Sequence, residues 1–298
     1  MIISASDREL KNKGLIMITI QNLSYSYNGP DTAVLKQLCL EIREGEHVAL
    51  IGPNGCGKTT LIRHLNALLT PQSGSVQVDG METTDEKHLK EIRRRVGLVF
   101  QNPDNQIVGM TVEEDVAFGP ENLGLPSAEI RRRVDEALVE VGMEAFAQRA
   151  PHTLSGGEKR LVSIAGVLAM APRYIAFDEP TAYLDPAGRQ RILKVIQKLH
   201  HRGIGIIHIT HDMNDLLDAN RLLVMDRGVI ALDGTPEAIF SRLDVMQDLG
   251  LQLPQVTLLL HRLQESGWEL NTNILTIEDA CTEITALMSR LKGARDAL

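Results

Sequence analysis

Short apolar runs alternate with segments of helical spacing along most of the chain. Residues 127–142, for example, place apolar side chains at the i, i+3, i+4 and i+7 positions of one helix face. Apolar runs too short for helices are typical of buried strands in a parallel sheet. They lie at residues 48–51, 96–100, 174–177, 204–209 and 222–225. The pattern therefore predicts an α/β fold, to which residues 228–231 would add a final edge strand.

Other segments predict what surrounds this sheet. Residues 18–27 and 34–42 have the pattern of two antiparallel strands joined by a turn at 28–31, and a short strand is expected at 75–80. Helical spacing covers residues 61–69, a charged segment ending at 95, 111–123, 127–142 and 158–170. We therefore expect a mixed-sheet core that carries an antiparallel β subdomain, and a helical insertion at about 102–170.

A glycine-rich loop joins the first apolar run to the first helix. It satisfies Gly-x-x-x-x-Gly-Lys-Thr, a pattern that binds phosphate when a strand precedes it and a helix follows. Its glycines let backbone N–H groups turn inward, and the positive end of the helix dipole favours an anion. Lys58 would reach the β- and γ-phosphates of a nucleotide, and Thr59 would bind Mg²⁺. The predicted phosphate-binding residues are Gly52, Pro53, Asn54, Gly55, Cys56, Gly57, Lys58, Thr59 and Thr60.

Polar residues end three of the later strands. Gln101, Asp178 and His211 each follow an apolar run closely, and ligands of open parallel sheets bind outside the carboxyl ends of the strands. Taken alone, Asp178-Glu179 fits exposed acids at a strand end as well as a Mg²⁺ site, but the phosphate loop upstream favours Mg²⁺. We therefore expect the loop and these side chains to form one site.

Composition limits the classes of function. The chain has 298 residues, a formal net charge of −8 and 3% aromatic residues, which argues against a general nucleic-acid binder. The runs 93–95 and 131–133 are all arginine, and we interpret them as solvated helix faces. The cysteines Cys39, Cys56 and Cys281 are too few for a disulfide framework and fit a reducing cytoplasm. No apolar run reaches about 18 residues, so any membrane role would require a partner.

These motifs, in this order, resemble the nucleotide-binding domain of ABC-type ATPases, and most closely the ATP-binding subunits of energy-coupling factor transporters. The resemblance spans about 17–240 and rests on the phosphate loop, Gln101, Leu154–Glu158, Asp178-Glu179, Leu184-Asp185 and His211. The narrower assignment rests on residues 101–106, 115–119 and 164–169. The resemblance implies a P-loop NTPase domain at 17–240. Residues 1–16 are mostly polar and show no period, which predicts a flexible extension, and helical spacing predicts an α-helical extension at 241–298.

The resemblance also implies roles for single residues. Tyr27, which could equally be an ordinary edge tyrosine, would stack on adenine. Gln101 and Asp178 would join Thr59 at Mg²⁺. Glu179 would act as general base on the attacking water, and His211 would contact the γ-phosphate. The residues expected to act on ATP held by a second subunit are the signature Ser155, Gly156, Gly157 and Glu158, with Asp185 of the D-loop.

ATP, Mg²⁺ and a membrane complex follow from the same resemblance. The expected partners are a second ATP-binding subunit, identical or paralogous, a transmembrane coupling subunit and a substrate-binding membrane subunit. The chain would lie on the cytoplasmic side of the cell membrane, where ATP-driven dimer closure energises uptake of a vitamin or a transition-metal ion. The alternatives are the ATPase of another ABC importer and a non-transport ABC ATPase acting on nucleic acid or ribosomes. A small-molecule kinase would leave Leu154–Glu158 unexplained.

A few positions depart from the family pattern. Glu158 stands where glutamine is usual, Cys56 where serine or alanine is commoner, and Ala182-Tyr183 where a serine and a small residue are frequent. None of these changes removes a group needed for the chemistry. In the tail, helices are expected at 256–264 and 277–291, which would pack on their own domain or contribute to dimer contacts.

Overall fold

All of the predicted apolar runs become strands of one sheet. The structure is a computed structural model that describes residues 17–29, 32–216, 218–251 and 254–296, so the extension expected at 1–16 lies outside the described residues. The strands of this sheet are β3 (His47–Ile51), β6 (Val96–Val99), β7 (Tyr174–Asp178), β8 (Gly205–Ile209), β9 (Arg221–Asp226) and β10 (Val229–Gly234).

The sheet has the order β10-β9-β3-β8-β7-β6, with six strands in the described part of the chain. β9, β3, β8, β7 and β6 are parallel, whereas β10 pairs antiparallel with β9 at the edge. Every residue of β3, β7 and β8 is buried. This burial explains why the strands read as continuous apolar runs rather than as alternating patterns.

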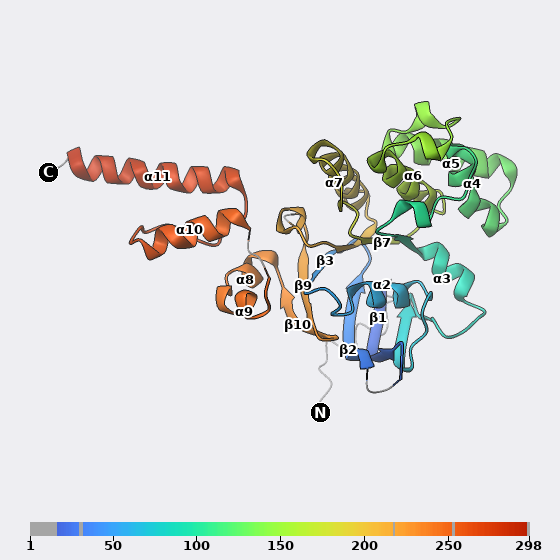
Figure 1. Cartoon of the computed structure of the whole chain (residues 1–298), viewed down its shortest axis with the longest axis horizontal. Helices are drawn as coiled ribbons and strands as arrows, with labels where there is room; N and C mark the ends of the chain where they lie inside the picture. The colour runs from blue at the N-terminus through green and yellow to red at the C-terminus, as the bar shows by residue number, and fades with distance from the viewer. Residues whose placement is uncertain (1–16, 30–31, 217, 252–253, 297–298) are drawn as a thin grey trace.

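A second sheet packs against the first one in the lower part of Figure 1. It consists of β1 (Met17–Ser26), β2 (Ala33–Arg43), β4 (Ser73–Val78) and β5 (Met81–Glu82), in the antiparallel order β2-β1-β4-β5. β4 lies two residues earlier than the predicted strand at 75–80, because Asp79 and Gly80 take φ values of +50° and +78° and form a turn. One apolar cluster joins the two sheets through Ile18, Leu38, Val48 and Val76.

Helices α3 (Leu89–Arg95), α4 (Val112–Leu123), α5 (Ser127–Val141) and α6 (Gly156–Leu168) agree closely with the predicted ones. Helix α2 (Lys58–Leu65) starts earlier than predicted and ends before the expected 69, because the chain turns at Ala67, which has a φ of +55°. α4, α5 and α6 form a separate lobe at the upper right of Figure 1. The arginine runs lie on α3 and α5. Of these six arginines, Arg94, Arg95, Arg131, Arg132 and Arg133 pair with acidic side chains.

One long helix has no counterpart among the predicted elements. α7 (Pro186–His201) begins at Asp185, which accepts a hydrogen bond from the backbone N–H of Gly188, and it carries a proline at its first position. Both features are helix-start signals, and Ile192, Val195, Ile196 and Leu199 form its buried face. Short 3₁₀ helices lie at Pro103–Asn105, Glu144–Phe146, Pro151–Thr153 and Met213–Leu216.

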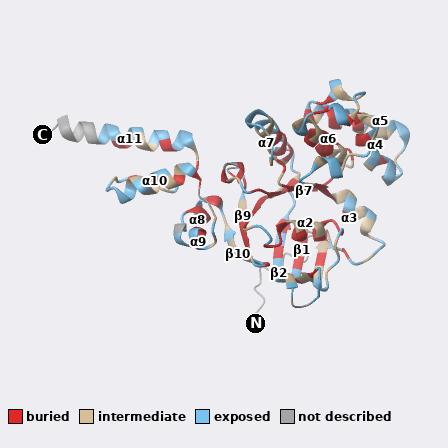
Figure 2. Cartoon of the chain, viewed as in Figure 1, coloured by how far each residue is buried: buried red, intermediate tan, exposed pale blue. Residues whose placement is uncertain are grey.

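The C-terminal segment contains α8 (Pro236–Phe240), α9 (Leu243–Asp248), α10 (Gln255–Glu265) and α11 (Ile277–Asp296). α8 packs beside the edge of the large sheet, where Ile239 and Phe240 are buried with Leu222 and Val224. α10 and α11 correspond to the predicted tail helices. They project away from the sheets in Figures 1 and 2 and share a small cluster of their own, Leu260, Leu270, Ala280 and Leu287. No helix in the described ranges is long and apolar enough to cross a membrane.

Candidate nucleotide site

Glycine is required at two positions of the loop between β3 and α2. Gly52 has a φ of +150° and Gly57 a φ of +112°, values that L-residues with side chains rarely adopt. A Cβ atom at Gly52 would lie 2.1 Å from the backbone oxygen of Met225, and one at Gly57 would lie 2.9 Å from the side chain of Leu35. The loop therefore passes so close to β9 and β2 that only glycine fits at both places.

Lys58 is held against the backbone of the same loop. Its side chain is almost buried, and its Nζ donates to the backbone oxygens of Gly52 at 2.7 Å and Pro53 at 3.0 Å. The Cys56 side chain is also buried, and burial raises the pKa of its thiol above the ordinary value. A raised pKa disfavours the reactive thiolate, so Cys56 is better explained as a small loop residue than as a reactive one.

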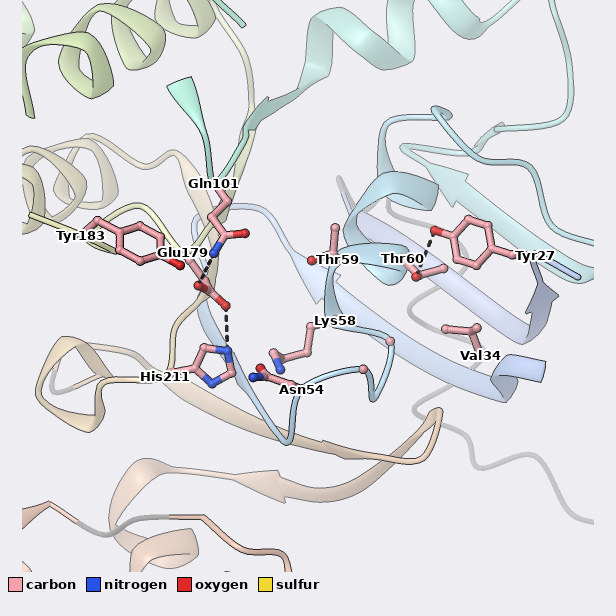
Figure 3. Close-up of a pocket in the computed structure, with 12 residues that line it drawn as sticks. Tyr27, Val34, Asn54, Lys58, Thr59, Thr60, Gln101, Glu179, Tyr183 and His211 are labelled. Atoms are coloured by element: carbon pink, nitrogen blue, oxygen red, sulfur yellow. Dashed lines mark hydrogen bonds and ion pairs between the residues drawn. The ribbon is translucent and has the colours of Figure 1, made fainter. Parts of the chain in front are cut away.

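The loop and the ends of three strands line one cavity of about 710 Å³. From the loop and the start of α2 come residues 54, 55 and 57–60, and from the strand ends come Gln101, Glu179 and His211. Figure 3 shows these side chains converging from opposite sides of the cavity. The expected convergence of the strand ends is therefore present in the structure. Gly52, Pro53, Cys56 and Asp178 belong to the same region but are not among the lining residues.

Glu179 is fixed between two other predicted site residues. Its Oε2 accepts a hydrogen bond from Gln101 Nε2 at 2.7 Å, and its Oε1 lies 2.7 Å from His211 Nε2. Its backbone has a φ of +49°, which is uncommon for a residue with a side chain, and its N–H donates to Ile209 at the end of β8. The carboxylate is therefore held in the cavity wall by residues that follow β6 and β8.

Thr59 and Asp178, the residue before Glu179, form a second polar pair. Thr59 Oγ1 donates to Asp178 Oδ1 at 3.1 Å, and burial raises the pKa of Asp178 against the opposing effect of that hydrogen bond. A hydroxyl, a carboxylate and the Gln101 amide are the hard oxygen donors that suit Mg²⁺. The described residues contain no group of three or more His, Cys, Asp or Glu side chains that could hold a metal. Mg²⁺ at this place would be completed by water or by the phosphates of a nucleotide, as is usual for this ion.

Tyr27 follows directly after β1 and lines the far end of the cavity. Its ring is half exposed, at 51%, and meets the ring of Tyr25 edge to face at 5.1 Å between centroids. Its hydroxyl lies 3.3 Å from Thr60 Oγ1. The ring is thus held from one side and open on the other, which suits a platform for a flat base.

The signature residues lie elsewhere. Ser155 caps α6, its Oγ accepts from the backbone N–H of Glu158, and the Glu158 carboxylate accepts from the N–H of Ser155. Gly156 lines a different cavity, of about 410 Å³, together with residues 101–104 and 182–184. None of the four signature residues lines the cavity at the phosphate loop.

Two lining residues were not predicted, Val34 at the start of β2 and Tyr183. Val34 carries no polar group, so only the pairing of β1 with β2 places it near Tyr27. Tyr183 is 96% exposed and has a φ of +63°. Its departure from the family pattern is visible in the sequence, but its position on the cavity wall depends on the turn after Glu179.

A nucleotide-binding loop, a carboxylate held beside it and a second glycine-bearing helix terminus together define an ATP-hydrolysing cassette. The profile of the family described as ABC transporter matches residues 35–182. The cobalt import ATP-binding protein CbiO of Syntrophus aciditrophicus is 59% identical over 273 residues, 92% of this chain and 98% of that protein. The energy-coupling factor transporter ATP-binding protein EcfA1 of Caldanaerobacter subterraneus subsp. tengcongensis is 51% identical over 267 residues, 88% of this chain and 96% of that protein.

Solved structures that resemble this chain are also ATP-binding cassettes of ABC transporters. CbiO1 from Clostridium perfringens, described as part of the transporter complex CbiONQ, matches with a TM-score of 0.71 and 39% identity over 83% of this chain and 99% of that one. The ATP-binding cassette MJ0796, a dimer with ADP and Pi, matches with a TM-score of 0.66 and 31% identity over 73% of this chain and 98% of that one.

The chain belongs to the ATP-binding subunits of ABC transporters, of the energy-coupling factor type. It binds ATP and couples ATP hydrolysis to transport across a membrane.

Proposed function

We propose that the chain energises uptake of a micronutrient, a vitamin or a transition-metal ion, as the ATPase of an energy-coupling factor importer. The fixed Glu179 carboxylate beside the phosphate loop is the observation that carries the catalytic part of this proposal. The names of the relatives support the transport part, since the relatives are described as cobalt import and energy-coupling factor proteins. The ATPase domain would comprise residues 17–240 and the C-terminal extension 241–298.

Each predicted site residue has a role in this proposal. Tyr27 stacks on adenine, while Lys58 and the loop amides of residues 52–60 bind the phosphates. Thr59, Gln101 and Asp178 would hold Mg²⁺, which would neutralise phosphate charge. Phosphoryl transfer depends mainly on positioning and on charge stabilisation, so these contacts carry most of the catalysis.

Glu179 acts as the general base. Water attacks the γ-phosphorus, the bond to the oxygen of ADP breaks, and the proton of the water passes toward the Glu179 carboxylate. Gln101 and His211 keep the carboxylate in place, since each contacts a different oxygen of it at 2.7 Å. His211 would also contact the γ-phosphate.

A second subunit completes each site. The signature Ser155–Glu158 lies outside the cavity of its own phosphate loop. In a head-to-tail dimer, the backbone N–H groups at the start of α6 would bind the γ-phosphate of the partner's ATP, and Asp185 would lie at the same interface. Hydrolysis removes that phosphate bridge, so the dimer opens and drives the membrane subunits by a population shift.

The first test replaces Glu179 by glutamine. Glu179→Gln keeps the contact with Gln101 but removes the base, so ATP should still bind while hydrolysis falls by about 10² or more. The variant should then elute as a dimer with ATP and as a monomer without it. Lys58→Ala, which removes a phosphate contact, is the matched control and should stay monomeric with ATP. A Glu179→Gln protein that remains monomeric with bound ATP would contradict the cross-dimer roles.

The second test identifies the partners. We expect the chain to lie on the cytoplasmic face of the cell membrane, bound to a transmembrane coupling subunit and to substrate-binding membrane subunits. Affinity purification from native membranes in mild detergent, followed by mass spectrometry, should recover these proteins and a second ATPase, identical or paralogous. Recovery of a soluble substrate-binding protein would favour another type of ABC importer. Recovery of ribosomal or DNA-bound material without membrane proteins would contradict the transport proposal.

A further inference from the structure

Arg160 of α6 is an arginine buried between the helical lobe and the large sheet. Its side chain is only 2% exposed, although arginine is almost never fully buried unless it is paired. Burial lowers its pKa to about 10. It makes no ion pair closer than 4 Å to any carboxylate in the described residues, although the charge of Asp178 opposes the effect of burial on its pKa. Its nearest stabilising contacts are therefore hydrogen bonds to neutral groups.

These hydrogen bonds go to one short stretch of backbone. Arg160 Nη1 donates to the carbonyl oxygen of Phe100, and Nη2 donates to that of Gln101. The two carbonyls are consecutive, so the planar guanidinium binds both at once in a forked arrangement that a lysine ammonium cannot reproduce. Arg160 thereby fixes the backbone at the point where β6 ends and the Gln101 loop begins.

The same residue Gln101 reaches the catalytic carboxylate. Its Nε2 donates to Glu179 at 2.7 Å, while its own carbonyl is held by Arg160. The backbone of Gln101 is therefore tied to α6, and its side chain is tied to Glu179. Arg160 itself contacts neither Glu179 nor the cavity at the phosphate loop.

α6 connects these contacts to the signature. Arg160 is the fifth residue of α6, about one turn after the Ser155 cap and the two glycines that begin the helix. A neighbouring contact joins the same two segments at the surface, where Lys159 Nζ lies 2.7 Å from Asp104, a residue whose side chain is 62% exposed. The ion pair between Lys159 and Asp104 joins α6 to the short 3₁₀ helix that follows Gln101. It does not involve Gln101 itself, so its removal offers a control.

We propose that Arg160 is a positioning residue for ATP hydrolysis, which holds Gln101 on Glu179 and links the catalytic carboxylate to the signature end of α6. The proposal rests on the function proposed above, because it assumes that Glu179 is the base and that the signature contacts the partner's ATP. When α6 moves with the partner's nucleotide, the backbone of Gln101 moves with it. The position of Glu179 in one subunit thereby depends on the ATP bound by the partner subunit, which the signature of the first subunit contacts.

The test compares Arg160→Lys in the intact chain and in a Gln101→Ala background. A single-turnover assay with enzyme in excess measures slow rates in both, and urea unfolding and ATP affinity are measured beside it. If Arg160 acts through Gln101, Arg160→Lys lowers the hydrolysis rate about tenfold in the intact chain, with less than about a twofold change in ATP affinity. In the Gln101→Ala background, the same change should alter the rate less than about twofold.

Lys159→Ala is the matched control, because it releases the same helix from the same loop but leaves Gln101 in place. It should keep the rate within about twofold. Equal losses from Arg160→Lys in both backgrounds, or a loss from Lys159→Ala as large as that from Arg160→Lys, would overturn the proposal in favour of a purely structural arginine. If Arg160→Lys does not fold, Arg160→Gln, which keeps an N–H donor without the charge, is measured in the same two backgrounds.

Failure of the inference and failure of the proposed function give different results. If Glu179→Gln still hydrolyses ATP normally, the catalytic roles themselves are wrong. If Glu179→Gln and Gln101→Ala are both slow but the effect of Arg160→Lys is independent of Gln101, only the positioning role of Arg160 is lost.

Discussion

At the scale of single residues, Tyr27 shows how a side chain can be held for a ligand before the ligand arrives. The Tyr25 ring packs against one edge of it, the Tyr25 ring in turn contacts the buried His64 at 4.7 Å, and the Tyr27 hydroxyl meets Thr60. These contacts limit the rotamers of Tyr27 while half of its surface stays exposed. A ring that is already ordered loses little conformational entropy when a base stacks on it.

We predict that Tyr27→Ala raises the Kd for ATP about tenfold, since stacking of a base on an aromatic ring contributes about 1–3 kcal/mol. Tyr27→Phe keeps the ring and removes only the contact with Thr60, so its Kd should stay within about twofold of the intact protein. Fluorescence titration with ATP in the absence of turnover measures both. If Tyr27→Ala binds ATP as tightly as Tyr27→Phe does, adenine does not stack there.

At the scale of elements, the parts that could be predicted are those whose signals are local. The strands of the large sheet are apolar runs because both faces are covered, and the phosphate loop is a contiguous motif between a strand and a helix. The meeting of Gln101, Glu179 and His211 followed from chain order, since parallel strands end at one edge. α7 could also have been predicted, because its Asp185 cap, its proline and its apolar stripe are all contiguous in the sequence.

Elements could not be predicted where distant contacts decide the outcome. The end of β4 depends on Asp79, whose buried carboxylate accepts hydrogen bonds from Arg95, Arg173 and Tyr174. Those partners come from α3 and from the start of β7, up to 95 residues away along the chain. The burial of Arg160 could not be predicted either. A basic residue is expected to be exposed, and only the fold brings the carbonyls of Phe100 and Gln101 to it.

At the scale of the whole molecule, global stability should depend on pH through imidazoles inside the large sheet. His47 of β3 and His208 of β8 are 2% and 0% exposed, and their rings stack at 6.1 Å between centroids. Burial, with His208 and His200 nearby, lowers the pKa of His47 to about 3. Burial, followed by the charge of Arg189, lowers the pKa of His208 to about 4. Both rings are therefore neutral in the folded protein near pH 7.

We predict that the free energy of unfolding falls as the pH drops from 7 to 5. The unfolded chain protonates these histidines below a pKa of about 6.5, whereas the folded chain does not until the pH approaches 4 or 3. The unfolded state thus binds more protons in this window, and each ring removes about 2 kcal/mol of stability at pH 5 relative to pH 8. Urea unfolding at pH 7, 6 and 5 measures the slope, which His208→Leu should reduce.

The carboxylate of Glu91 does not account for the same slope. Hydrogen bonds from Arg94 lower the pKa of Glu91 to about 2, so its contribution is present above its usual value of 4.5 and is lost only below that. The matched control removes an exposed imidazole, His152→Leu, from the lobe beside α6. If the His208→Leu variant loses as much stability between pH 7 and 5 as the intact protein and the His152→Leu variant do, then burial does not lower the pKa of His208 and the prediction is wrong.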